Sequence, residues 1–308
     1  MTELKTRDLA AVQRRSAAER ITTKRRSQGR MIITRFLRHR MAVFGMVLFL
    51  LIVILAFLGP TVWRWDYFIH REIPSSAPPS WDHPFGTTRA GQDYLAQVMR
   101  GTQQSIKVGL VTAVLSAVIG GFLGAMAGLY GGAVDNVIMR FVDLLFVIPS
   151  LVILIVVAGF LGASTWWQTA LILGAFAWLN TARVVRGVVL SLREQEFIEA
   201  ARGMGASNTR IILRHLIPNS MNVMIVDFTL VIAVAILAEA SLSFLGLGIQ
   251  PPDVSLGFLI NQSRTSVWTR PWLFYTPGVV IILIVLAINF IGDGLRDALD
   301  PRQSQLRR

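Results

Sequence analysis

The sequence contains no cysteine, which excludes disulfide bonds, thiolate metal sites and thiol nucleophiles. Charged residues are also scarce, at 16% of the 308 residues, whereas hydrophobic residues make up 53% and the mean hydropathy is +0.56. A water-soluble chain of this length needs more polar surface than these values provide. We therefore interpret the chain as an integral membrane protein.

The sequence offers little support for a metal site, a nucleotide site or a catalytic centre. The four histidines are dispersed and form no His-Glu-x-x-His pair, and no Gly-Lys-Ser/Thr loop is present to hold phosphates. We therefore expect the chain to bind no cofactor itself. A membrane-embedded enzyme would need polar groups that converge within the spans, and Ser241 and Ser243 have no base nearby in the sequence. We expect a non-catalytic protein.

The net charge of +12 is concentrated in residues 1–40, which hold twelve basic and three acidic residues. No aromatic residue precedes Phe36 to stack on a base, which argues against nucleic acid as a partner. A basic segment directly before an apolar run is instead typical of a cytoplasmic tail. At the end of this tail, an amphipathic stretch with Met31, Ile33, Phe36 and Leu37 is expected to lie on membrane lipids.

Hydrophobic runs long enough to cross a bilayer predict an all-α transmembrane domain over residues 41–295. Pro149 should kink the third of its spans. Gly120, Gly124 and Gly128 lie on one face of the second span, so a neighbouring helix backbone should approach that face closely. The six expected spans are residues 41–58, 108–129, 142–161, 167–181, 221–244 and 276–291.

The distribution of basic residues predicts the orientation of these spans. Six spans place both termini on the same side of the membrane. Residues 1–40, 183–219 and 296–308 hold twelve, six and four basic residues, whereas the two long outer segments, 60–105 and 246–275, hold four and two. Because cytoplasmic segments are enriched in Lys and Arg, we expect both the N-terminal tail and the 296–308 tail in the cytoplasm.

Between the fourth and fifth spans, residues 196–219 predict a hairpin of two short helices. In the first helix, Phe197, Ala201 and Met204 are spaced to form one apolar stripe. The stripe would give this helix a face to pack against a neighbour.

The junction and the end of this hairpin also have sequence signals. Gly205 suits the left-handed position that ends a helix, and Ser207 can cap a second helix that should end near Leu216, before Pro218. On these grounds alone, docking into a groove of a partner protein and lying on the lipid headgroups are equally good interpretations of the hairpin.

Several motifs together resemble one transporter family. Glu199-Ala200-Ala201, followed by Gly205 and Pro218, resembles the EAA motif of permease subunits in ATP-binding cassette importers. The segments HPFGTTRAGQD, RFVDLLFVIPSL, LAEASLSFLGLGIQPP and NFIGDGLRDALDPR resemble sequences of the C-type permeases in the dipeptide and oligopeptide branch, which are DppC/OppC-like. The likeness extends over about residues 35–302.

The sequence departs from the family pattern at four positions. His215 and Ile217 stand where the general EAA pattern has Ile and Leu, and His at the first of these positions is common in the peptide branch. Thr88 and Gln92 stand where the branch has Asp and Arg. These last two departures leave the class of solute open.

The resemblance implies a type I importer permease of the bacterial cytoplasmic (inner) membrane, with six spans and both termini inside. It implies import of dipeptides or oligopeptides, with nickel chelate or haem as alternatives. The implied partners are a second homologous permease, an extracytoplasmic solute-binding protein, and two ATPase subunits that use ATP and Mg. An ion-coupled secondary carrier, the alternative from another class, would lack a hairpin for docking an ATPase.

The resemblance also implies candidate site residues. The residues expected to couple to the ATPase are Glu199, Ala200, Ala201, Gly205, Ala206, Arg214, His215 and Pro218. The residues expected to contact the binding protein are His83, Phe85 and Asp93.

Two acidic residues, Asp227 and Glu239, lie inside the fifth span. A charge there costs about 2.5–3.5 kcal/mol, so each should face protein or water rather than lipid. We expect interior hydrogen bonds, with a contact on the translocation path as the alternative.

Overall fold

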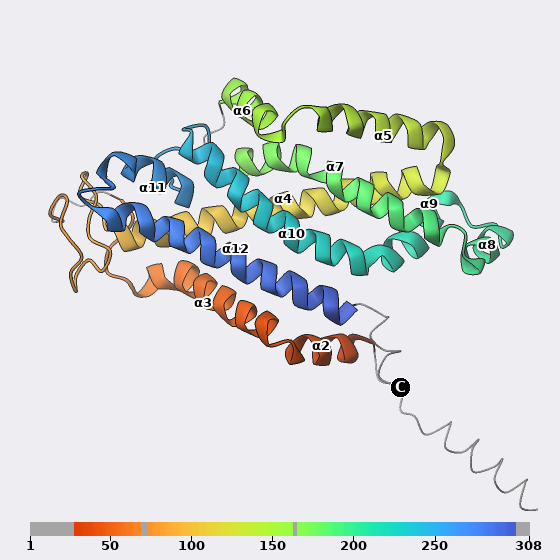
Figure 1. The fold of residues 1–308 in the computed structure, drawn as a ribbon, viewed down its shortest axis with the longest axis horizontal. Helices are drawn as coiled ribbons and strands as arrows, with labels where there is room; N and C mark the ends of the chain where they lie inside the picture. The colour runs from red at the N-terminus through yellow and green to blue at the C-terminus, as the bar shows by residue number, and fades with distance from the viewer. Residues whose placement is uncertain (1–27, 69–72, 163–164, 300–308) are drawn as a thin grey trace, which may run out of the picture.

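The computed structural model describes residues 28–68, 73–162 and 165–299. All regular elements within these ranges are helices (Figure 1), and an isolated β-bridge joins Thr87 to Asp93. The predicted all-α class is therefore confirmed. The tails expected at 1–40 and 296–308 lie partly outside the described residues, at 1–27 and 300–308.

Long helices lie side by side and form the body of the molecule (Figure 1). They are α3 (Arg40–Val62), α4 (Tyr94–Tyr130), α7 (Trp166–Leu192), α10 (Ile217–Phe244) and α12 (Pro271–Leu299). α4 packs against α7 and α10, and α12 packs against α10 and α3. Five helical segments in the described part of the chain are long and apolar enough to cross a membrane, with α10 counted together with the helical turns before it, from Asn208.

These helices extend beyond the apolar runs that predict them. The clearest case is α4, which begins at Tyr94 rather than near residue 108, so that part of the expected outer loop is helical. Asp93 explains this start, because its side chain accepts a hydrogen bond from the Ala96 amide at 2.8 Å and caps the helix. At 1.5 Å per residue, a helix of 37 residues is about 55 Å long, more than a bilayer core requires.

The third expected span is a broken pair of helices rather than one kinked helix. α5 (Gly132–Val147) and α6 (Ser150–Leu161) meet at an angle of 87°. Proline disfavours a helical conformation in the residue before it, and Ile148, before Pro149, is extended with a ψ of 129°. The bend predicted at Pro149 is therefore present, but it is a break between two helices rather than a kink within one. The chain has six candidate spans only if this pair crosses the membrane as one broken span.

The close approach predicted for the glycine face of α4 is present at α7. A Cβ atom on Gly124 would lie 2.4 Å from the carbonyl oxygen of Ala182, and one on Gly120 would lie 2.7 Å from that of Trp178. The backbones of α4 and α7 therefore touch where larger side chains would hold them apart.

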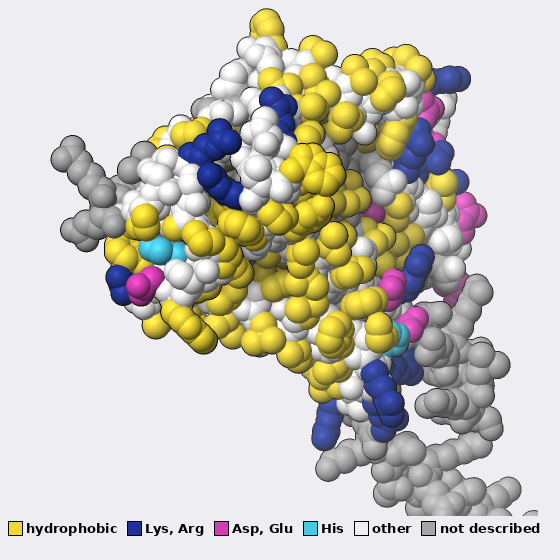
Figure 2. Space-filling model, turned by 60° about the vertical axis from the view of Figure 1, so that its left-hand side comes forward, with side chains coloured by type: hydrophobic (Ala, Val, Ile, Leu, Met, Phe, Trp, Pro, Cys, Tyr) yellow, Lys and Arg dark blue, Asp and Glu magenta, His cyan; other side chains and the backbone are white. Residues whose placement is uncertain are grey.

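The outer surface fits a membrane environment. Figure 2 shows a broad apolar surface, with charged side chains gathered mainly at its margins. α2 (Gln28–Arg38) continues this surface at the N-terminal side, where Met31, Ile33 and Leu37 are exposed. Phe36 is half-buried.

The hairpin and the outer cap lie at opposite ends of the molecule. α8 (Glu196–Gly203) and α9 (Asn208–Ile211) lie at one end, which we call the hairpin end (Figure 1). The outer cap, residues 63–93 as described, and α11 (Leu256–Ser263) lie at the opposite end, which we call the outer end.

Candidate functional site

The predicted hairpin is present, and its turn has the predicted conformation. Gly205 is left-handed, with a φ of +80°, and its amide donates to the carbonyl of Arg202 at 2.9 Å. The side chain of Ser207 then caps α9 by accepting a hydrogen bond from the Arg210 amide at 3.4 Å. The turn is therefore set by local sequence, with glycine at the one position that needs a positive φ.

The hairpin packs on the bundle through a different apolar face from the predicted one. Ile198 is buried in a cluster with Ile211 and side chains of α4 and α7, and Ala201 is buried as well. Phe197 and Met204 are instead 41% and 82% exposed. The prediction of a stripe through these two residues is wrong, because the buried face is rotated by one residue along α8.

Pro218 does not end the second helix of the hairpin, contrary to prediction. A π-helical turn, η1 (Ile212–Leu216), joins α9 to α10, and the Ile217 amide donates to the carbonyl of Ile212. Proline has no N–H to donate, and its ring crowds the preceding turn, which is here the wider π-helical one. The side chain of Asn219 also donates to the carbonyl of His215 at 2.6 Å. The wider turn thus accommodates the proline, and the helical segment runs unbroken from Asn208 to Phe244.

The motif residues form an exposed knuckle at the tip of the hairpin. Space around Gly205 is open, since a Cβ placed there would meet no atom within 4 Å among the described residues. Glu199, Ala200, Gly205, Arg214 and Pro218 are exposed, Ala206 and His215 are half-buried, and Ala201 is buried. Exposed small residues on a firmly packed hairpin are suited to insertion into a groove, and their side chains supply no catalytic chemistry.

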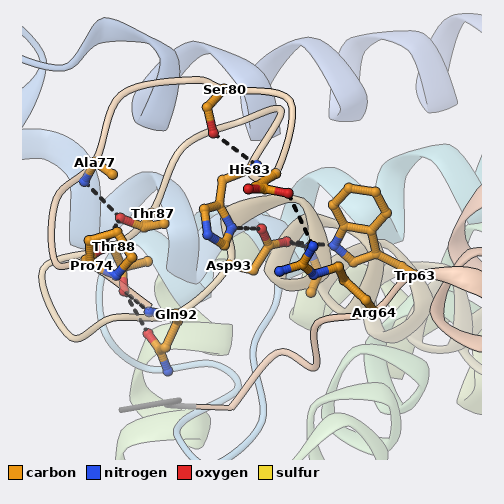
Figure 3. Close-up of polar contacts among 12 residues, drawn as sticks. Trp63, Arg64, Pro74, Ala77, Ser80, His83, Thr87, Thr88, Gln92 and Asp93 are labelled. Atoms are coloured by element: carbon orange, nitrogen blue, oxygen red, sulfur yellow. Dashed lines mark hydrogen bonds and ion pairs between the residues drawn. The ribbon is translucent and has the colours of Figure 1, made fainter. Parts of the chain in front are cut away.

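At the outer end, Asp93 is the centre of a buried polar cluster in the outer cap (Figure 3). One carboxylate oxygen lies 2.7 Å from Nδ1 of His83, and the other accepts hydrogen bonds from Nε1 of Trp63 at 3.1 Å and from the Ala96 amide. His83 is 6% exposed and Asp93 is fully buried. The cluster ties the cap to the first turn of α4.

These positions show what two of the expected contact residues do within the cap. The side chains of His83 and Asp93 bind each other and are buried, and a contact of this part of the cap with a binding protein stays a prediction. Phe85 is half-buried against the main core, and contact through it stays a prediction. A sequence motif does not distinguish residues that build a loop from residues that the loop displays.

The two departures from the family pattern in the cap form a local pair. The Thr88 hydroxyl lies 3.1 Å from Oε1 of Gln92, and it accepts a hydrogen bond from the Gln92 amide, also at 3.1 Å. Beside them, the Thr87 hydroxyl donates to the carbonyl of Pro74 and accepts from the Ala77 amide (Figure 3). A neutral pair thus stands where the resembling sequences have a charged one.

Asp227 has hydrogen-bond partners on a neighbouring helix. Its carboxylate accepts from Thr181 at 2.5 Å and from Asn180 at 3.2 Å, both on α7, and the Thr181 hydroxyl lies 2.7 Å from that of Ser116 on α4. Asp227 is 7% exposed, and it borders a pocket of about 450 Å³ with mainly apolar walls, including Leu154. The sequence did not identify these partners, although an Asn at the end of a span is a usable signal.

Glu239 is fully buried and does not border that pocket. Its oxygens accept hydrogen bonds from Ser105 on α4 at 2.8 Å and from Ser243 at 2.7 Å. The interior hydrogen bonding expected for both acidic residues is present, and the structure does not bring them together.

The helical bundle, the bent α5–α6 pair and the packed hairpin are features of a multi-span membrane protein, and comparison with known proteins gives its class. Residues 120–305 match the family described as "Binding-protein-dependent transport system inner membrane component". Residues 27–79 match the "N-terminal TM domain of oligopeptide transport permease C". The chain therefore belongs to the family of inner membrane components of binding-protein-dependent transport systems.

Individual relatives extend over nearly the whole chain. The oligopeptide transport system permease protein OppC of Mycobacterium tuberculosis (strain ATCC 25618 / H37Rv) is 44% identical over 283 residues, which are 92% of this chain and 97% of that protein. OppC of Bacillus subtilis (strain 168) is 37% identical over 285 residues, which are 92% of this chain and 93% of that protein.

A solved structure shows the same fold. A chain of the MetNI methionine ABC transporter in an inward-facing conformation superposes with a TM-score of 0.53 at 20% identity, covering 66% of this chain and 96% of that one. The expected type I importer permease fold is therefore confirmed, as is the location in the inner membrane that the family description gives.

Proposed function

We propose that this chain is one of two permease subunits in an ATP-driven importer that takes dipeptides or oligopeptides from an extracytoplasmic binding protein. The names of the relatives support peptides as the solute. The observation that carries the coupling role is the continuous helical segment from Asn208 to Phe244, which joins the exposed knuckle to the middle of the bundle.

The proposed mechanism is a population shift between two arrangements of the bundle. ATP binding closes the two ATPase subunits and moves the residue 199–218 hairpin that is docked in one of them. Because the segment from Asn208 onward has no break at Pro218, a movement of the hairpin is transmitted along α10 rather than absorbed at its start. The shift opens the path toward the binding protein, and ATP hydrolysis resets it.

The pocket beside Asp227 is the place on this chain that best suits a translocation path. It combines an apolar wall with one carboxylate, and α10, which contributes Asp227, is the helix that continues from the hairpin. A carboxylate in a mainly apolar pocket fits a solute that has a cationic amino group and apolar side chains, as peptides do.

The proposed function is tested by reconstitution into proteoliposomes. The complete complex, with ATP inside the vesicles and its own binding protein outside, should accumulate a radiolabelled tripeptide, and this chain reconstituted alone should not. A vesicle without ATP and one without the binding protein are the controls. Uptake of the tripeptide by the single chain would refute the proposal. So would a complex that takes up other solutes in the presence of ATP but takes up no peptide.

A further inference from the structure

A second pocket lies at the outer end, between the outer cap, α11 and the first turn of α12. Its volume is about 230 Å³, and the described residues that line it include no Asp or Glu. Its polar lining residues include Thr88, Arg89, Tyr94, Ser263, Ser266 and Arg270. Two arginines without a carboxylate at the same pocket give it a positive charge.

One of these arginines has unused hydrogen-bonding capacity. Within the part of the chain that the structure describes, Nη1 of Arg270 is buried and has no hydrogen-bond partner. Buried polar groups in folded proteins are nearly always paired, and an unpaired guanidinium nitrogen is costly. The guanidinium group also has the planar geometry that binds a carboxylate or phosphate through two parallel hydrogen bonds.

The neighbouring polar groups arrange the rest of the pocket. Nη2 of Arg89 donates to the Ser266 hydroxyl at 3.3 Å, although the two residues are 177 positions apart in the sequence. The Tyr94 hydroxyl donates to the carbonyl of Leu273 and lies 3.4 Å from the hydroxyl of Ser263. Its hydrogen is therefore already used in a bond within the pocket wall. The buried donor without a partner in the described part of this pocket is therefore Nη1 of Arg270, with the guanidinium of Arg89 also in the lining.

We propose that this pocket binds a carboxylate, supplied by an acidic side chain on the solute-binding protein when that protein docks. The proposal rests on the proposed function, which places the outer end toward the binding protein. The neighbouring surface favours a protein ligand. Trp268, two residues before Arg270 in the sequence, is 93% exposed, and exposed aromatic residues and arginine are both enriched at protein interfaces. An anionic lipid headgroup is the competing source of negative charge.

The test measures the affinity of the complete complex, in nanodiscs of phosphatidylcholine, for its own binding protein. Arg270→Gln should raise the Kd about tenfold, because it removes one side of a charge pair that is desolvated on docking. Arg264→Gln is the matched control. It removes the same charge in the same segment, but the Arg264 side chain is exposed and does not line the pocket. It should change the Kd less than twofold.

A second variant guards against failure of assembly. If Arg270→Gln lowers the amount of complex recovered, Arg89→Gln, at an exposed position, should still raise the Kd relative to Arg264→Gln. Equal affinities for wild type, Arg270→Gln and Arg89→Gln would overturn the proposal. So would an effect that appears only when phosphatidylglycerol is added to the nanodiscs, because the ligand would then be a lipid headgroup.

The two proposals can fail separately. If the wild-type complex binds no solute-binding protein, the proposed function itself fails. If the wild type binds it and the arginine variants bind it equally well, only the carboxylate site fails.

Discussion

Gly205 lies in the part of the hairpin that is proposed to contact the ATPase, and it has the backbone conformation that ends α8. Its left-handed backbone would cost an L-residue about 1 kcal/mol, and the space around it is open toward solvent. A small substituent there should therefore be tolerated by the isolated chain. A large one should interfere only when a groove closes around the knuckle.

This difference gives the first prediction. Gly205→Trp should leave the chain inserted but abolish binding-protein-stimulated ATP hydrolysis, because the indole collides with the ATPase groove. Gly205→Ala, which adds backbone strain but little bulk, should retain most of the stimulation. Glu199→Ala, which removes a polar group without adding bulk, should also be mild. Membrane insertion, ATPase co-purification and stimulated hydrolysis are measured for each variant.

The control for bulk is Gly187→Trp. Gly187 is exposed on α7, and a Cβ there meets no described atom within 4 Å, but it lies away from the knuckle. This variant should behave like wild type. Wild-type co-purification and stimulation by Gly205→Trp would contradict docking, whereas loss of insertion would show that the hairpin is needed for folding of the bundle.

At the scale of elements, the periodicity of the sequence predicts the helices and the faces on which they pack. The apolar runs identify the long helices, and the spacing of Gly120, Gly124 and Gly128 identifies the face on which α7 packs, since a repeat of four residues lies on one helical face. The left-handed turn at Gly205 is equally local, because only backbone conformation decides it.

What the sequence does not predict depends on tertiary partners. A proline favours the end of a helix, but the π-helical turn before it lets the helical segment continue past Pro218. His83 and Asp93 belong to a motif in a polar loop, and only the folded cap shows that they are buried. Pattern alone also did not reveal the hydrogen bonds from α7 to Asp227, because they link residues 46 and 47 positions apart.

The α4–α7 contact gives a prediction at this scale. Gly124→Ala should destabilise the purified chain by about 1–3 kcal/mol, because the new methyl group would lie 2.4 Å from a backbone oxygen that has no room to move. Gly121→Ala is the matched control on the next position of the helix, since its methyl group meets only the flexible end of Met224. Thermal unfolding in detergent measures both.

The two variants separate backbone contact from general crowding. Gly121→Ala should change the midpoint of unfolding much less than Gly124→Ala. Equal shifts for the two variants would show that α4 and α7 adjust their separation freely, and the close contact would then not be a determinant of stability.

At the scale of the whole molecule, three observations support the expectation that the hairpin end faces the cytoplasm. The basic residues concentrate in the segments 1–40, 183–219 and 296–308. The hairpin lies at one end of the molecule, and α12 runs from the opposite end toward it, with α2 beside the last turns of α12 (Figure 1). His39 and Asp297 lie 3.4 Å apart and join these two terminal segments. An even number of crossings is required if both termini share one side.

The last prediction tests this orientation directly. Because the natural chain has no cysteine, single cysteines can be introduced without first removing others. Ser75→Cys, exposed in the outer cap, should react with a membrane-impermeant maleimide in intact cells, and Thr209→Cys, exposed on α9, should react only after the cells are opened. Labelling of both in opened cells is the control for accessibility. Reaction of Thr209→Cys in intact cells, or protection of Ser75→Cys there, would contradict the orientation, and with it the access of the knuckle to an ATPase. Reaction in the predicted pattern would also require the bent α5–α6 pair to count as one crossing, since α3, α4, α7, α10 and α12 supply only five by themselves.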